Sequence, residues 1–558
     1  MRPFNKDRAL RKIKIKQNKN PYIKRISIVL SCIILIIGIM LFTFAKFEST
    51  YEYTLINGQI SSYSSANLQI TRNEIEIHSK RVNISNGTAT YDYDLSGQNI
   101  TNATNISCNN NAYATIENNI FKISNITTDT ICKINDNINF TINNLDNTNN
   151  NIKIIKNENT TNVLTLTSKQ VDLDLNGKTI TYTNGNNQNM FNNNGTSNIN
   201  IHDGTLTANN LVGYAICDNR GTLTFNNVTI NGDSNNRLFW VRDNGVLDIK
   251  NSTITASNSG IISTHNGGSN LATNANVIIE NSTLNSVNEA IDNYHNGTIT
   301  IKSGTFNGTN IVVRNLNAGS VKIFNGNFQS SSNSVVYNVS SGTVDIEGGI
   351  YIGTTSNANS IINNAGTGTI NISDKTSRVY IGNFNSGSSS SNPKAILNKN
   401  SGLINISGHK ANNCTDNKNN TTSGICLYSY YRTLVNEDVS TGTVKVDGAS
   451  IVSNSHCALC HFAKNTYVKN VDIKSVNDTA VYAAYNTNVL NPSSASLKIC
   501  NAEIVTYNNN KDVVIHSGYT GSASYYNVKF RNGSTTPNST YITDTNNKLV
   551  SSSSACNW

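Results

Sequence analysis

The chain repeats one short phrase six times: Leu-Thr-Phe-Asn-Asn-Val-Thr-Ile (223–230), Leu-Asp-Ile-Lys-Asn-Ser-Thr-Ile (247–254), Val-Ile-Ile-Glu-Asn-Ser-Thr-Leu (277–284), Ile-Thr-Ile-Lys-Ser-Gly-Thr-Phe (299–306), Val-Lys-Ile-Phe-Asn-Gly-Asn-Phe (321–328) and Val-Asp-Ile-Glu-Gly-Gly-Ile-Tyr (344–351). The third residues of the phrases are 24, 30, 22, 22 and 23 residues apart. A period in this range is typical of a solenoid, because one repeat cannot bury its apolar residues without its neighbours.

Each repeat contains three apolar segments separated by turn residues. The alternating phrase predicts a first strand, and a second strand follows an Asn, Ser or Gly corner, as at 204–207 and 252–254. A third apolar phrase then ends in an Asn/Gly turn, as at 238–245 and 290–297. Asn and Gly supply the positive φ that tight corners need. Extended over residues 146–545, the pattern predicts about fourteen coils.

Alignment of the third strands gives two columns. An apolar ladder is expected to face inward, formed by Ile216, Phe239, Ile262, Ile291, Val312, Val336, Ile362 and Ile396. Two residues further on, a column includes Asn293, Asn338, Asn364 and Asn398. The two-residue period of a strand places this column on the same inward side, where stacked amides can satisfy one another.

The solenoid pattern resembles the right-handed parallel β-helix of the pectin-lyase-like kind, over roughly 400 residues. The three strands per coil, the corner glycines and the asparagine column carry this resemblance. It implies an all-β fold, in a class whose members include polysaccharide lyases, polygalacturonases, phage tailspikes and bacterial cell-surface adhesins. Fold alone therefore leaves the function open.

The N-terminus predicts a membrane anchor. Residues 1–25 hold ten of the 43 basic residues and only one of the 34 acids, and the following apolar segment, 26–45, has 19 uncharged residues from Ile26 to Phe44. This length suits a transmembrane helix, and the basic flank places the N-terminus in the cytoplasm and the bulk of the chain outside the cell. A cleaved signal peptide is the alternative.

A juxtamembrane β stalk is expected at 46–145, and a C-terminal cap or tail at 546–558. In an oxidising compartment the cysteines are disulfide candidates. Cys108 and Cys132 are expected to pair, Cys426 to bridge to Cys457 or Cys460, and Cys500 and Cys556 to fix the C-terminal end. Cys217 is the expected unpaired thiol.

Charge is low apart from the basic tail. Charged residues make up 14% of the chain, and beyond residue 25 acids and bases balance. Nucleic-acid binding requires a positive face on the folded domain, so this composition argues against it.

The sequence contains no full set of catalytic phrases of the known β-helix enzymes. Asp172 and Asp174 lie two residues apart, on one face of a predicted strand at roughly 7 Å, which suits glycoside hydrolysis formally; two solvated side chains are the favoured interpretation. A polysaccharide lyase or glycoside hydrolase remains the alternative function.

A second phrase, 456–461, reads His-Cys-Ala-Leu-Cys-His. Cys-x-x-Cys-His is the attachment phrase of c-type haem, and the four side chains are also zinc-ligand types. The phrase falls where a third strand is expected, so the structural role of its cysteines is favoured, and no cofactor or metal is predicted.

The best binding-site candidates are the outward neighbours of the inward ladder on the third strands: Trp240, Arg242, His265, Asp292 and Tyr294, with His295, Arg220 and Asp243 near the turn. Aromatic faces stack on sugar rings, while Arg and Asp bond hydroxyl or acidic groups. The sequence therefore favours a membrane-anchored, cell-surface β-helix that binds a glycan or another surface as an adhesin. A structural spacer is the second alternative.

Overall fold

The computed structural model describes residues 64–558 with gaps, the longest of which are 97–104, 136–149, 265–273, 485–494 and 533–546. The basic tail and the predicted span at 26–45 lie outside the described residues. Within the described part, no helix combines the length and the hydropathy needed to cross a membrane.

Residues 64–135 form a small β module with its own buried core, which includes Leu68, Ile70 and Phe121. Its strands are β1 (Ser64–Arg72), β2 (Ile75–Ile84), β3 (Ala89–Asp94), β4 (Asn105–Cys108), β5 (Tyr113–Glu117), β6 (Ile120–Ile126) and β7 (Thr130–Asn135). The disulfide Cys108–Cys132 joins the antiparallel neighbours β4 and β7. The sequence predicted strands in this region and this pairing; the role of a stalk stays a prediction.

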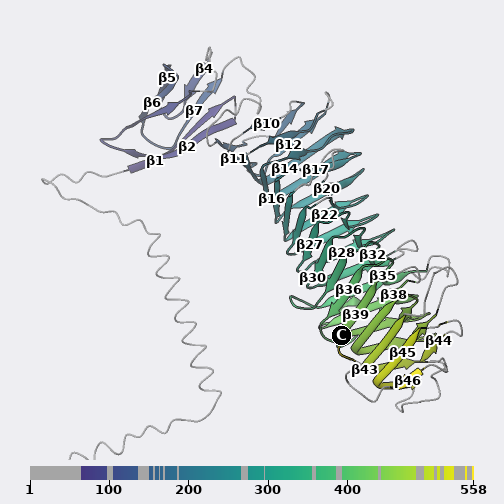
Figure 1. Ribbon diagram of the computed structural model, residues 1–558. Coiled ribbons are helices and arrows are strands. Elements are labelled where there is room, and N and C mark those ends of the chain that lie inside the picture. Colours follow the sequence, from purple (N-terminus) through teal and green to yellow (C-terminus); the bar gives the residue numbers. More distant parts are fainter. Residues whose placement is uncertain are drawn as a thin grey trace, which may run out of the picture. The chain divides into compact units, whose positions relative to one another are not determined.

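The remaining described residues form a parallel β-solenoid of about twelve turns. The third strands alone make a sheet of fourteen, so the predicted count of about fourteen coils is close (Figure 1). The strands of this third sheet are β10 (Leu164–Thr167), β13 (Phe191–Asn194), β15 (Cys217–Asn219), β17 (Arg237–Val241), β20 (Gly260–Ser263), β23 (Ile291–Asn293), β26 (Val313–Asn315), β29 (Val336–Asn338), β32 (Ser360–Asn364), β35 (Lys394–Asn398), β38 (Arg432–Asn436), β40 (Leu459–His461), β42 (Val481–Ala483) and β44 (Val513–Ile515).

The first and second strands of each coil form the two other faces. Strands confined to the first sheet are β8 (Asn150–Lys153), β11 (Gln170–Asp174), β18 (Val246–Lys250), β21 (Asn276–Glu280), β24 (Thr298–Ile301), β27 (Ser320–Ile323), β30 (Thr343–Ile346), β33 (Thr369–Ile372), β36 (Leu403–Ser407) and β46 (Asn547–Leu549). Strands confined to the second sheet are β9 (Glu158–Thr160), β12 (Thr179–Thr183), β19 (Thr253–Ala256), β22 (Ser282–Ser286), β25 (Gly304–Gly308), β28 (Asn327–Ser330), β31 (Gly349–Gly353), β34 (Val379–Asn383) and β37 (Ile425–Ser429). Six long strands bend from the first sheet into the second: β14 (Asn198–Leu211), β16 (Thr222–Ser234), β39 (Thr443–Ser453), β41 (Asn465–Ser475), β43 (Ser496–Thr506) and β45 (Ser522–Asn532).

The corner between the first and second strands explains the recurrent Asn and Gly. Asn227, Asn251 and Asn281 adopt φ of 57°, 49° and 46°, and the next coil uses Gly304 at φ 143°. A Cβ on Gly304 would lie 2.3 Å from the Ser282 carbonyl oxygen. Only residues that tolerate positive φ fit these corners, as the sequence predicted.

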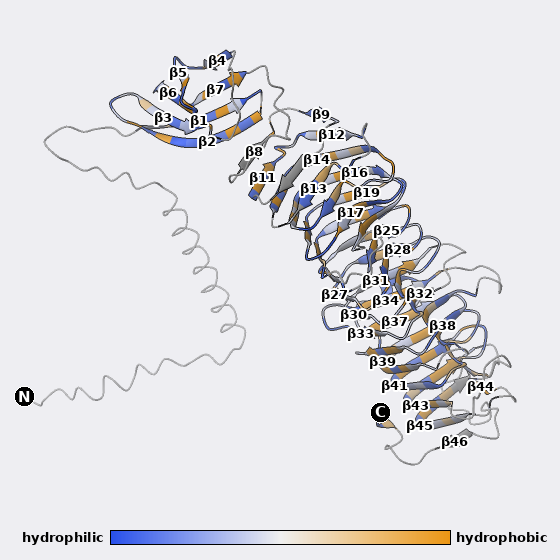
Figure 2. Ribbon diagram, turned by 45° about the horizontal axis from the view of Figure 1, so that its top comes forward, coloured by the Kyte–Doolittle hydropathy of each residue, from blue (hydrophilic) through white to orange (hydrophobic). Residues whose placement is uncertain are grey.

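Alternation along each strand fills one continuous core. In β16, for example, Leu223, Phe225, Val228 and Ile230 are buried, while the polar residues between them are exposed or half-exposed. Hydrophobic and hydrophilic residues are interspersed in this way along the strands of the solenoid (Figure 2). Aromatic rings also stack along the axis, with ring centroids 4.6 Å apart for Phe306 and Phe328 and 4.8 Å apart for Phe328 and Tyr351. Each coil therefore buries its apolar residues against the coils on both sides.

The third sheet contains the predicted inward columns, with two register corrections. Cys217 pairs with Phe239, and Val313 pairs with Ile291 and Val336, so the prediction of Ile216 and Val312 at these positions was wrong by one residue. Both misassigned residues are buried, one position before the ladder. The asparagine column is confirmed and longer than predicted, because Asn193, Asn219, Asn315 and Asn436 also belong to it.

Side-chain hydrogen bonds run through this column without interruption over six coils. The amide nitrogens of Asn293, Asn315, Asn338, Asn364 and Asn398 each donate to the next amide oxygen at 2.9–3.2 Å, ending on Asn436. All six side chains are buried. The column therefore satisfies its polar groups internally, as stacked amides can.

Candidate functional site

Two of the predicted binding residues, Trp240 and Asp292, lie in one outward column of the third sheet. Successive coils place Asp218, Trp240, Ser263, Asp292 and Arg314 in register. Neighbouring parallel strands are about 4.8 Å apart, so Trp240 and Asp292 are separated by roughly 10 Å. The column divides into two ionic groups, one on each side of Ser263.

The first group surrounds Trp240, which is half-buried. The guanidinium of Arg242 lies 5.1 Å from the centre of the Trp240 ring, and its Nε is 3.4 Å from the Asp218 carboxylate. Burial raises the pKa of Asp218, although the charges of Arg242 and Arg220 oppose this shift. The arrangement fixes the Arg242 side chain between a carboxylate and an aromatic face.

A hollow of about 780 Å³ lies at the turns that follow β15 and β17. Arg220 and Asp243 line it and form an ion pair of 3.4 Å, and both side chains are more than 40% exposed. Charged groups of both signs thus face solvent one residue away from Arg242. A polar ligand in this hollow would meet a donor and an acceptor side by side.

The second group corrects one prediction. Asp292 was expected to be an exposed binding residue, but its side chain is fully buried. Arg314 donates to both of its carboxylate oxygens at 2.7 and 2.8 Å, and Arg237 donates at 2.5 Å. Burial lowers the pKa of Arg314, but the hydrogen bond and charge of Asp292 outweigh it, so that pKa is raised.

Glu289 completes this group. It lies 3.0 Å from Nη2 of Arg237 and 3.3 Å from Nη1 of Arg314. Arg237 spans a whole coil to reach it, and it can do so because the coil between has Gly260, where a Cβ would lie 2.8 Å from the Arg237 Nε. The two carboxylates and two guanidiniums neutralise one another. The group therefore links three coils, passing over the coil of Gly260, and does not present a catalytic pair of acids.

Of the remaining candidates, Tyr294 follows β23 and is half-buried, and its backbone amide donates to Thr264 at 2.6 Å. His265 and His295 lie outside the described residues. The structure therefore brings Trp240, Arg242, Arg220 and Asp243 together in one group, and places Asp292 in another.

Asp172 and Asp174 flank a histidine that sequence analysis did not single out. His202, in the next coil, lies 3.4 Å from Asp172, 3.9 Å from Asp174 and 2.9 Å from Asp203. Burial lowers the pKa of His202, but these three carboxylates raise it above the usual range in total. The cluster lies on the outer face of the first sheet. Asp172 and Asp174 therefore face an imidazole of their own chain.

The cysteines pair differently from one prediction. Cys426 bonds to Cys414, and Cys457 bonds to Cys460, so a bridge from Cys426 to either was wrong. Cys426 belongs to the second sheet in β37, on a different face from Cys457 and Cys460.

Two further cysteine predictions agree with the structure. Cys500 pairs with Cys556, and Cys217 is a buried free thiol. Burial raises the pKa of Cys217 above the usual thiol range.

The phrase 456–461 places its two histidines in different environments. His456 Nδ1 lies 3.2 Å from the sulfur of Cys457, while His461 is fully buried in the asparagine column, between Thr466 at 2.8 Å and Tyr519 at 3.0 Å. Both sulfurs of the phrase are bonded to one another, so neither is a thiolate ligand in this state. In the structure, the second half of the phrase forms β40, and the Cys457–Cys460 disulfide links β40 to the residues before it.

Comparison with protein-family models, with curated proteins and with solved structures finds no match. The function is therefore argued from the geometry of this chain.

Proposed function

We propose that the chain is a membrane-anchored protein of the bacterial cell surface, whose right-handed, pectin-lyase-like β-helix binds carbohydrate as an adhesin. The apolar segment 26–45 behind a basic tail supports the anchor and the outward orientation. Four disulfides among the described residues support an oxidising compartment.

The observation that carries the proposal is the group around Trp240. Its indole ring is partly open to solvent, Arg242 is fixed against it, and Arg220 and Asp243 line the adjoining hollow. Sugar rings stack on indole faces, and their hydroxyls accept from guanidinium and donate to carboxylate. The volume of about 780 Å³ lies within the range of small-ligand sites.

A glycan array probed with the full-length chain in detergent tests this function. Trp240→Ala is expected to reduce binding at least tenfold, because it removes the stacking surface. Tyr337→Ala is the matched control, since Tyr337 is a half-buried aromatic in the same outward column four coils away. Absence of binding to every glycan would favour the structural spacer, and equal losses in the two variants would exclude the Trp240 group as the site.

A further inference from the structure

The outer face of the second sheet carries two continuous columns of uncharged polar residues. We call this surface the threonine face. Its first column is Thr179, Thr205, Thr229, Thr253, Thr283, Thr305 and Asn327, and its second is Thr181, Thr207, Asn231, Thr255, Asn285, Asn307 and Gln329. All fourteen side chains are exposed or half-exposed. They stand on seven successive coils in unbroken parallel register.

The other outer faces of the same coils differ in composition. The first sheet carries charged side chains in its outward columns, among them Asp172, Asp248, Lys250, Glu280 and Lys322. The third sheet carries the ion-paired groups around Trp240 and Asp292. Charged side chains thus occur on both other outer faces of these coils, whereas the two columns of the threonine face contain none.

The same two columns change character where the chain covers them. From β31 onward they contain Ile350, Tyr380 and Cys426, and Ile352, Gly382 and Tyr428. Tyr380, Cys426 and Tyr428 form an apolar cluster with residues of the segment 411–414, which the Cys414–Cys426 disulfide attaches to the sheet. Apolar residues therefore mark the covered part of this face. Neutral polar residues occupy the seven coils before it, and charged residues such as Asp472, Lys474 and Glu503 enter the columns after it.

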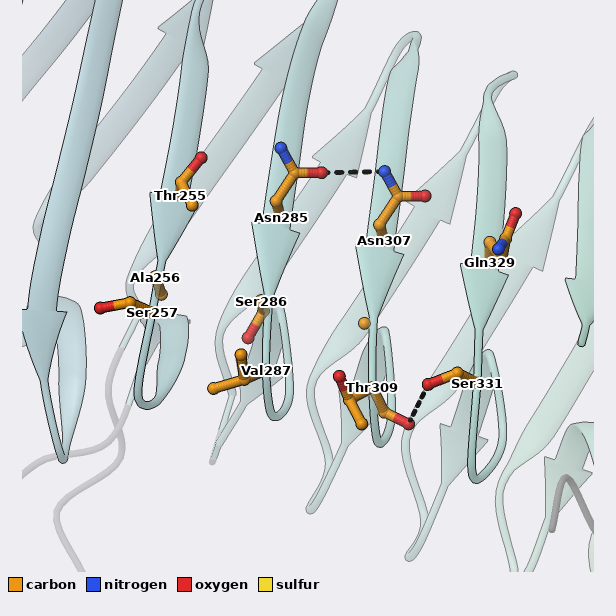
Figure 3. Close-up of a pocket in the computed structure, with 11 residues that line it drawn as sticks. Thr255, Ala256, Ser257, Asn285, Ser286, Val287, Asn307, Thr309, Gln329 and Ser331 are labelled. Carbon is orange, nitrogen blue, oxygen red and sulfur yellow. Dashed lines mark hydrogen bonds between the residues drawn. The ribbon is translucent and has the colours of Figure 1, made fainter. Parts of the chain in front are cut away.

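A hollow of about 490 Å³ is sunk into one edge of the threonine face (Figure 3). Thr255, Asn285, Asn307 and Gln329 lie in a row along it, and the Asn307 amide donates to the Asn285 oxygen at 2.8 Å. Val287, 45% exposed, lines the same hollow. Polar groups and one apolar surface thus meet in a space large enough for a small ligand or a segment of a polymer.

We propose that the threonine face binds a neutral, extended polysaccharide laid across the coils. Its hydroxyl and amide groups both donate and accept, as sugar hydroxyls do. They recur about every 4.8 Å along the axis and roughly 6.8 Å along each strand, so the seven coils offer a straight array of about 30 Å. The absence of charge from all fourteen positions matches an uncharged polymer and offers no cation to a polyanion.

This site is separate from the Trp240 group, which lies on the third sheet, and the two can be tested apart. The full-length chain in detergent is sedimented with microcrystalline cellulose, with chitin and with polygalacturonate gel as an acidic comparator. Binding to at least one neutral polymer is expected to persist from 50 to 500 mM NaCl, because no ion pair contributes to it. Loss of this binding in Trp240→Ala, with none in the variants of the threonine face, would assign it to the Trp240 group and overturn the proposal.

Thr305→Asp is expected to weaken binding to the neutral polymer at least tenfold, since it places a charge within the array, on the same strand as Asn307, which lines the hollow. Thr300→Asp is the matched control: it makes the same change in the same coil, outward on the first sheet. Asn307→Asp, which keeps the side-chain shape, should give the same loss if Thr305→Asp fails to fold. Failure of the wild-type chain to bind either neutral polymer, or equal losses in the Thr300 and Thr305 variants, would overturn the proposal.

Discussion

Asn338→Ala is expected to destabilise the coils around it by about 3 kcal/mol. The Asn338 side chain is fully buried and donates to the Asn364 amide oxygen and to the Gly342 carbonyl oxygen, both at 3.0 Å. Its own oxygen accepts from Asn315 at 3.0 Å. Three hydrogen bonds are lost, each contributing about 1 kcal/mol, and buried partners on both sides of the gap keep unmet polar groups.

Local opening is the appropriate measurement, because coils of a solenoid are stabilised mainly by their neighbours and do not share one global transition. Hydrogen exchange of peptides covering β26, β29 and β32 should accelerate roughly 100-fold, which corresponds to about 3 kcal/mol. Peptides from β41 to β45 should exchange as in the wild type.

Asn307→Ala provides the matched control. Asn307 also donates to an asparagine of the preceding coil, but it does so on the outer face, where water can replace the lost bond. Its cost is expected to stay below about 1 kcal/mol. If Asn338→Ala accelerates exchange no more than Asn307→Ala does, the internal amide column is not a source of stability and the reasoning fails.

Three further changes test other parts of the scaffold. Asp292→Asn should cost about 3–5 kcal/mol, because it leaves two arginines with only Glu289 as a partner. Hydrogen exchange of peptides covering β17, β23 and β26 measures this, and a cost below about 1 kcal/mol would contradict a structural role for the ion-paired group. Phe328→Ala should cost about 3–5 kcal/mol, because it opens a cavity between two stacked rings. The expected result is a lower thermal midpoint together with faster amide hydrogen exchange in β25 and β31, and an unchanged midpoint would refute it. Burial lowers the pKa of His461 to about 3, so between pH 3 and 6.5 the unfolded state binds more protons than the folded state. The free energy of unfolding therefore decreases as the pH is lowered through this window, by about 2 kcal/mol at pH 5 relative to neutral pH. His461→Asn should flatten the acid side of the stability profile, and an unchanged slope would show that other groups cause it.

The coil architecture could be predicted because its determinants are local. Alternation, the corner Asn or Gly and the repeat length all lie within one phrase, and neighbouring phrases repeat them. The register errors arose where apolar residues are adjacent, as in 311–313, because such a run has no internal phase. The asparagine two residues after the ladder, Asn219 or Asn315, fixes that phase, and it would have identified Cys217 and Val313.

The candidate site was predicted less well, because its partners are distant in the sequence. Arg237 reaches Asp292 across 55 residues and through the space left by Gly260. Alternation correctly placed Asp292 on the outward side of its strand, but it cannot tell an exposed carboxylate from one covered by two arginines. Arg314 was missed for the same reason as Val313, since the one-residue error turned it away from the outward column.

Stability and binding depend on different residues of the solenoid: stability depends mainly on the core, and binding depends on the three outer faces. The core is alike from coil to coil, so it imposes nearly the same backbone spacing along the whole array. Core packing does not restrict the outward residues, and these differ between the three faces. The first sheet carries charged side chains, the second carries neutral hydroxyls and amides, and the third carries coupled ion pairs with one tryptophan. Outward substitutions on the first two faces should therefore alter what the solenoid contacts with little effect on its folding, whereas Asp292 is outward yet structural. A residue of this chain is best assigned to binding when it is outward and accessible to solvent and is not held in a buried ion pair, which favours Thr305 and Asn307 over Asp292.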